Sequence, residues 1–204
     1  MGTTLVVALA VLVAAVASNA ADDGGNSPQP QEVDIAKFLR GSNGIWTHSS
    51  SDKNLVCKYD EIKEVSDTHA SLRRYIKIRS PKVDSASNKR KPKGVDFEAE
   101  FRTWTSGHEI ESKYTAMTLK YKDGAIYRVE AITYQNSPCA VASVSIRRDS
   151  RRRNTVESML EIWVQYNATS NSADLACVPQ AKRWISERYR DMHLFDVVDR
   201  SCLG

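Results

Sequence analysis

The chain has 204 residues, and its 29 lysines and arginines exceed its 25 aspartates and glutamates, which gives a formal net charge of +4. A chain of this length can form one domain with a substantial core. Its four histidines are scattered and its four cysteines are widely spaced, so that no metal-ligand motif forms and neither a metal nor a cofactor is expected.

Residues 1–20 have the pattern of a secretory signal peptide. Positions 5–17 are thirteen consecutive apolar residues, whereas a membrane anchor needs roughly 20. We therefore expect cleavage after Ala20 and a secreted, extracellular protein without a membrane span. Residues 21–33 are rich in Gly, Pro, Gln and acids, which predicts a disordered leader before a single domain at 34–204.

A short helix is predicted at the start of this domain. Asp34 is a candidate N-cap, the side chains of Ile35, Phe38 and Leu39 share one face, and Gly41 is a candidate end. A second helix is predicted near the C-terminus in the segment PQAKRWISERYR, which begins at Pro179.

Strand signals dominate between the two helices. Alternating or apolar runs predict eight strands, at 44–50, 54–60, 72–79, 96–104, 113–121, 125–134, 139–147 and 158–166. Asp123-Gly124 between two such runs is a strong hairpin signal. The sequence therefore predicts an all-β fold, an eight-stranded antiparallel up-and-down barrel with a C-terminal helix packed outside it. A two-sheet sandwich is the alternative; a closed barrel has no sheet edges and can hold one small ligand.

Three short motifs carry a resemblance to a known family. Gly-Ile-Trp at 44–46 follows the first helix, and Cys-Ala-Val at 139–141 is followed by Glu-Ile-Trp at 161–163 and by Cys177. In this pattern the chain resembles the tick salivary lipocalins of the histamine-binding family. The resemblance implies a lipocalin (calycin) barrel, secretion in saliva and a monomer.

The four cysteines are expected to form two disulfides in an oxidising compartment, and their spacing leaves three pairings open. The resemblance implies the pairs Cys57–Cys202 and Cys139–Cys177. Asn167 lies in a glycosylation sequon, which is consistent with secretion.

The resemblance also implies a ligand site inside the barrel, lined by Glu161, Trp163, Glu130, Trp46 and Ala140. Amine-binding members have an aspartate where this chain has Ala140, which alternation places in an apolar wall with Ala142, Val144 and Ile146. Glu130 falls on a strand face with Arg128, Ile132 and Tyr134. The alternatives are an Arg128–Glu130 pair, a structural salt bridge for Glu161, and plain core packing for the two tryptophans.

Two basic segments are predicted to rim the ligand mouth. Five arginines stand in the segment IRRDSRRRN, predicted as the loop between the last two strands: Arg147, Arg148, Arg151, Arg152 and Arg153. The loop after the third strand carries Lys82, Lys89, Arg90, Lys91 and Lys93, and alternate loops of an up-and-down barrel share one end. A positive rim attracts anions. A host surface such as a glycosaminoglycan and a merely solvated loop are alternatives, whereas nucleic acid is not expected because no aromatic residues lie between the arginines.

No nucleophile elbow, phosphate loop or metal motif appears, so the chain is not expected to be an enzyme. We expect a carrier that sequesters a small host inflammatory mediator and so aids evasion of host defence. Histamine or another biogenic amine is what the resemblance implies; Ala140 and the basic mouth favour an amphipathic anion such as a leukotriene or a fatty acid. The alternatives are an anti-haemostatic or anti-complement inhibitor that binds a host protein through its outer loops, and a barrel that serves only as an antigenic surface.

Overall fold

The computed structural model describes residues 32–79, 92–103, 114–150, 153–166, 176–197 and 202. The predicted signal peptide and nearly all of the predicted leader lie outside these ranges. The elements in chain order are α1 (Ile35–Arg40), β1 (Gly44–Ser50), β2 (Leu55–Val65), β3 (His69–Ile78), β4 (Val95–Arg102), β5 (Ala116–Lys120), β6 (Ile126–Asn136), β7 (Cys139–Ser150), β8 (Arg153–Tyr166), α2 (Val178–Arg188) and β9 (Phe195–Asp196).

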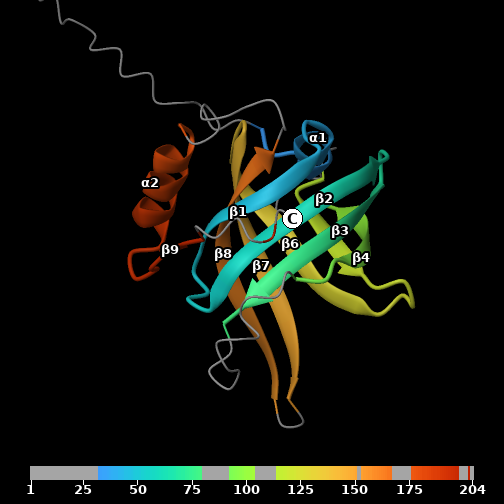
Figure 1. The fold of residues 1–204 in the computed structure, drawn as a ribbon. Helices are drawn as coiled ribbons and strands as arrows, with labels where there is room; N and C mark the ends of the chain where they lie inside the picture. The colour runs from blue at the N-terminus through green and yellow to red at the C-terminus, as the bar shows by residue number, and fades with distance from the viewer. Residues whose placement is uncertain are drawn as a thin grey trace, which may run out of the picture.

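The sheet closes on itself as a barrel (Figure 1). Strands β2 to β8 pair in sequence, and β1 pairs with β8 on one side and with β2 on the other, every pair being antiparallel. The predicted eight-stranded up-and-down barrel is therefore confirmed. The two-residue strand β9 was not predicted; it pairs with β1 at Ser49 and Ser50.

The hairpin of β7 and β8 is longer than predicted. Ladder pairing continues to Ser150 opposite Arg153, and Arg147 and Arg148 pair with Val156 and Thr155. The prediction that the arginines of this segment lie in a loop is wrong for Arg147, Arg148 and Arg153, because the strands extend several residues beyond the apolar alternation that defined them. The predicted Asp-Gly turn is present: Gly124 has φ 84°, a left-handed conformation that glycine adopts without strain.

The two ends of the barrel differ. Helix α1 lies across one end, where Ile35, Phe38 and Leu39 are buried. The Asp34 carboxylate accepts a hydrogen bond from the Lys37 N–H at 2.9 Å and caps the helix as predicted, and Gln165 Nε2 donates to the Phe38 carbonyl at 2.6 Å. We call the opposite end the entrance; there β3 ends, β4 begins, β5 ends and β6 begins.

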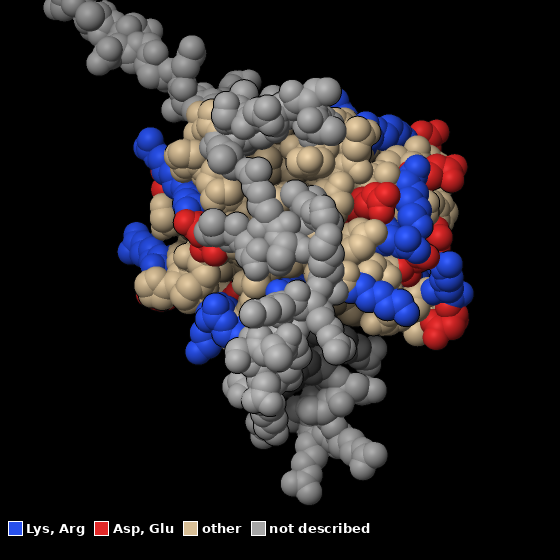
Figure 2. Space-filling view, in the orientation of Figure 1, with Lys and Arg blue, Asp and Glu red and all other residues tan. Residues whose placement is uncertain are grey.

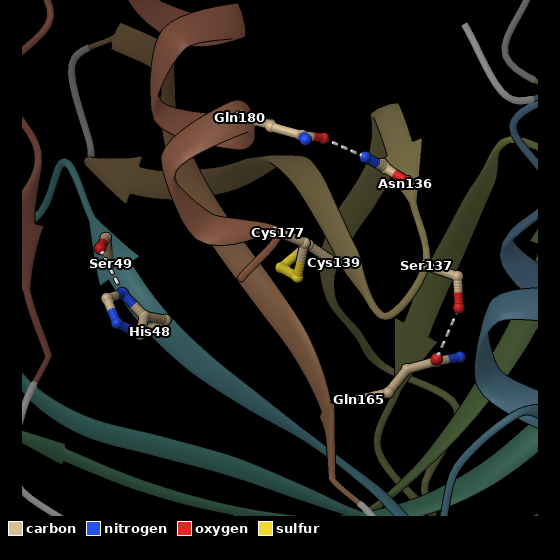
Figure 3. Close-up of a disulfide and its surroundings, with 8 residues drawn as sticks. All are labelled: His48, Ser49, Asn136, Ser137, Cys139, Gln165, Cys177 and Gln180. Atoms are coloured by element: carbon tan, nitrogen blue, oxygen red, sulfur yellow. Dashed lines mark hydrogen bonds between the residues drawn. A yellow bond between two sulfur atoms is a disulfide. The ribbon is translucent and has the colours of Figure 1, made fainter. Parts of the chain in front are cut away.

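Helix α2 packs on the outside of the barrel through an apolar cluster shared with β7 and β8. Val178, Ala181 and Ile185 are its buried residues. The Cys139–Cys177 disulfide fastens the start of the helix to β7, and beside it the Asn136 amide donates a hydrogen bond to Gln180 (Figure 3). The second disulfide joins Cys57 to Cys202. Both disulfides are those that the resemblance implied.

One irregular position in β6 decides which of its side chains face the interior. Between Ile132 and Tyr134 the pairing of β6 with β7 shifts register. Ile132 therefore stays in the interior cluster, whereas Tyr134 packs outside against Trp184, with ring centroids 5.4 Å apart. The expectation that Tyr134 shares the face of Glu130 is wrong for this reason.

The glycine of the Gly-Ile-Trp motif has a packing role. A Cβ atom on Gly44 would lie 2.6 Å or less from three atoms of the Tyr59 side chain, so only glycine lets β1 approach this side chain.

Candidate functional site

Among the described residues, six ionisable side chains lie inside the barrel, in a cluster that we call the charged belt. Its members are Lys58 and Asp60 on β2, Arg74 on β3, Arg128 and Glu130 on β6, and Glu161 on β8. None is more than 3% exposed. With three cations and three carboxylates the belt is formally neutral, as burial of charge requires.

Strand alternation explains why these charged residues face the interior. Arg74 follows buried Leu72 by two residues on β3, and Glu130 precedes buried Ile132 by two on β6. Residues two apart on a strand share a face. The belt residues thus stand at positions where an ordinary barrel would have apolar side chains, and each needs a partner from another strand.

Lys58 connects two of the belt carboxylates. Its Nζ lies 2.6 Å from Glu161 Oε2 and 3.3 Å from Glu130 Oε1, and 4.9 Å from the centroid of the Trp163 ring. Burial lowers the pKa of the ammonium, and the nearby Arg74 lowers it further, against the opposing effect of the two carboxylates.

The Glu161 carboxylate is held by three donors on one oxygen. Besides Lys58, Trp163 Nε1 donates to Oε2 at 2.7 Å and Thr47 Oγ1 donates at 3.4 Å. Burial alone would raise the pKa of this carboxyl, but the adjacent Lys58 holds it below its usual value. Glu161 is therefore an anion already paired with a cation of the chain, and its Oε2 carries three donors.

Arg74 is the best-satisfied cation of the belt. Its Nε and Nη2 donate to the two oxygens of Asp60 at 2.6 Å each. Its Nη1 and Nη2 also donate to Glu130 at 2.9 and 3.0 Å. Burial opposes the charged form, yet the two carboxylates raise the pKa of the guanidinium well above its ordinary value.

Arg128 differs from the other two cations because part of its guanidinium lacks an acceptor. Its Nε lies 2.6 Å from Glu130 Oε1, an ion pair without hydrogen-bond geometry. Within the described part of the chain, neither Nε nor Nη2 finds a hydrogen-bond acceptor, although the residue is 3% exposed. Burial raises the pKa of Glu130, but the three surrounding cations, Arg128 foremost, hold it below its usual range.

Several apolar and aromatic side chains lie on the entrance side of the belt. The rings of Phe97, Tyr121 and Tyr127 form a trio with centroids 4.8 to 5.3 Å apart, and the Arg128 Cζ lies 5.0 Å from the Tyr127 centroid. Ile78, Val95 and Ile126, at strand ends of the entrance, are 53%, 41% and 65% exposed. Described apolar side chains are thus present both at the entrance and beside the guanidinium.

Four of the five predicted ligand-site residues come together in the interior. Ala140 is paired with Trp163 across β7 and β8, Ala142 is paired with Glu161, and the wall of Ala140, Ala142 and Val144 is buried and apolar. Glu130 reaches the same cluster through Lys58. Trp46 lies apart: its neighbours Ile45 and Thr47 face the interior, so its half-buried ring is on the outer face.

Lys58, Asp60 and Arg74 were not predicted from the sequence as site residues. The available signal was the placement of charges on the same strand face as apolar residues. Their partners lie 14 to 103 positions away in the chain, so the pairs appear only once the strand register is known.

Most of the predicted basic rim lies outside the description of the structure. Of Arg147, Arg148 and Arg153 only the backbone is described; Arg151, Arg152, Lys82, Lys89, Arg90, Lys91 and Asn167 fall outside the described residues. On the visible face the described lysines and arginines alternate with aspartates and glutamates (Figure 2). Asp96, for instance, lies within 3.3 Å of Lys63, Arg73 and Lys122.

Within the described ranges no helix is long and apolar enough to cross a membrane, and no group of three His, Cys, Asp or Glu side chains could hold a metal ion.

Comparison with known proteins gives only distant structural likeness. No family model and no curated protein matches the chain. Solved structures similar to it include the siderocalin Ex-FABP, at 8% identity and a TM-score of 0.45, over 76% of this chain and 88% of that one. Japanin from Rhipicephalus appendiculatus bound to cholesterol is similar at 11% identity and a TM-score of 0.45, over 79% of this chain and 95% of that one. A bovine odorant binding protein triple mutant is also similar, at 12% identity and a TM-score of 0.46, over 80% of this chain and 96% of that one. At such values the likeness assigns neither a family nor a ligand, so the functional argument rests on the site.

Proposed function

We propose that this protein is a secreted carrier that binds one small amphipathic anion, such as a leukotriene or a fatty acid, inside its barrel. The observation that carries the proposal is the position of Lys58, whose ammonium is bonded to Glu161 and lies beside Glu130 over the Trp163 ring. The chain's own amine thus occupies the contacts that a bound amine would need.

A free amine would have to displace Lys58 or share its carboxylates. Both carboxylates already have positive partners, since Glu130 is also paired with Arg74 and Arg128. A second ammonium would add an uncompensated charge to a site excluded from water, which is strongly unfavourable. The belt therefore disfavours histamine, the ligand that the resemblance implied.

An anion meets the opposite situation. Among the described belt residues, the donors left without an acceptor belong to a cation, Arg128, and the aromatic ring of Tyr127 lies beside it. A ligand with an apolar body and one acidic group matches both features. Such a carrier acts by mass action without turnover, and the resemblance to tick salivary proteins supports a host lipid mediator as the ligand.

The test is calorimetric titration of the mature, oxidised protein with histamine, a leukotriene and a long-chain fatty acid at physiological salt. We expect one-to-one binding of the leukotriene or the fatty acid and no heat with histamine. Tight histamine binding would contradict the proposal. If none of the three produces heat, the carrier proposal fails, and a host protein bound through the outer loops becomes the next hypothesis to test.

A further inference from the structure

We infer that Arg128, together with the ring trio of Phe97, Tyr121 and Tyr127, forms a subsite for the acidic head of the ligand, with the apolar body extending toward the entrance. This inference rests on the proposed carrier function and adds to it the anchoring residue and the orientation of the ligand.

The first argument is the unused hydrogen-bonding capacity of Arg128. A buried N–H without an acceptor costs free energy, and the cost is larger on a charged group. Arg128 Nε and Nη2 are both in this state within the described structure. Lys58 and Arg74, in contrast, both donate hydrogen bonds to carboxylates of the belt. A carboxylate placed at Nη2 would supply the missing acceptor as a charge-assisted hydrogen bond.

The second argument is how the charge is shared. Asp60 is bonded to Arg74, and Glu161 to Lys58, each at 2.6 Å. Glu130 is the carboxylate beside Arg128, and its Oε1 also lies 2.9 Å from Arg74 Nη1 and 3.3 Å from Lys58 Nζ. Since Arg128 shares its counter-ion with two other cations, it is the least compensated charge of the belt and the one that an incoming anion would approach.

The third argument is the depth of Arg128 in the barrel. It pairs with Leu119, whereas Glu130, two positions further along β6, pairs with Met117 and lies deeper. Arg128 is therefore at the entrance side of the belt, within 5.0 Å of the Tyr127 ring. A ligand that enters head first along the β6 side passes the aromatic trio and meets Arg128 before it meets Glu130.

A buried water molecule is the competing occupant, because water also satisfies orphaned donors in protein interiors. The two occupants differ in what they imply for ligand chemistry. With a water on Arg128, a fatty acid and the alcohol of equal chain length would bind alike and would be insensitive to Arg128. With the proposed subsite, the acid is preferred and the preference depends on the guanidinium.

The experiment measures binding of a long-chain fatty acid and its matching alcohol to the wild type and to R128Q, R128K and R102Q. Arg102 is the matched control, since its side chain is 54% exposed and lies outside the belt. We expect wild type and R102Q to prefer the acid, and R128Q to bind the acid at least about tenfold more weakly while its affinity for the alcohol is unchanged. R128K, which keeps the charge, should fall between them.

A second measurement does not depend on the stability of a variant. In the wild-type complex, the carboxyl carbon of a ¹³C-labelled fatty acid should report an ionised group at pH values where the free acid is protonated, because the guanidinium stabilises the anion. Equal affinity for acid and alcohol in the wild type, or a bound carboxyl that titrates like the free acid, would overturn the inference while leaving a carrier. If the wild type binds neither the fatty acid nor the leukotriene, the proposed function fails and this inference fails with it.

Discussion

At the scale of single residues, Lys58 explains why two buried glutamates need not indicate an amine site. Its ammonium makes the ion pairs and the aromatic contact that a ligand ammonium would make, but it is covalently part of β2. A lysine on the outer face of β2 would leave the Glu161 carboxylate without this ion pair. The proposed preference for an anion thus depends on one residue that lies outside the Gly-Ile-Trp, Cys-Ala-Val and Glu-Ile-Trp motifs.

Replacement of Lys58 by methionine should therefore be strongly destabilising. It leaves Glu161 as a buried charge without a cation, a change that costs about 3–5 kcal/mol in comparable buried pairs, whereas Glu130 keeps its two arginines. Urea unfolding measures the loss. Methylammonium in the buffer should recover part of the stability of K58M and none of that of the wild type.

The double variant K58M/E161Q is the control, since it removes both members of the pair. The free energy of unfolding of the double variant should be closer to the wild-type value than that of K58M is. The stability of the double variant should not respond to methylammonium. Equal stability of K58M and the wild type would show that Glu161 does not depend on this ammonium.

At the scale of elements, the strands could be predicted from sequence because alternation and an Asp-Gly turn are local signals. The predicted start and end of β1 agree with the structure to the residue, and all eight barrel strands were found. What local signals could not give is register. The shift between Ile132 and Tyr134 turns one aromatic residue outward, and the belt pairs join strands far apart in sequence. The site is therefore less predictable than the fold.

The two disulfides should differ in how much they stabilise the folded protein. The Cys57–Cys202 pair closes a separation of 145 residues and the Cys139–Cys177 pair one of 38, so loop-closure entropy assigns them about 5 and about 4 kcal/mol. We expect C57A/C202A to lose more unfolding free energy in urea than C139A/C177A.

Ligand affinity should survive in C139A/C177A, because this disulfide and α2 pack on the outside of the barrel, away from the belt. A loss of binding by C139A/C177A, under conditions in which the variant is still folded, would contradict the placement of the ligand inside.

At the scale of the whole molecule, the belt makes stability depend on acid pH. The pKa values of Glu130 and Glu161 are held below their ordinary value by the neighbouring cations, so over the interval between the folded and unfolded pKa values the unfolded chain binds more protons. Stability from these groups is fully present above the unfolded pKa, about 4.3, and is lost as the pH falls through the folded values. The contribution of these two carboxyls to the free energy of unfolding should thus be level from pH 7 to about pH 5 and fall below about pH 4.

Salt distinguishes the belt from the surface. Exposed pairs such as Arg102–Glu100 are screened at high ionic strength, whereas pairs inside the barrel are screened much less. The acid fall in stability should therefore persist in 1 M NaCl and become shallower in K58M/E161Q, which lacks one of the two carboxylates. A wild-type profile that flattens in high salt would place the acid-sensitive groups on the surface, and would count against a buried belt of charges as the feature that selects the ligand.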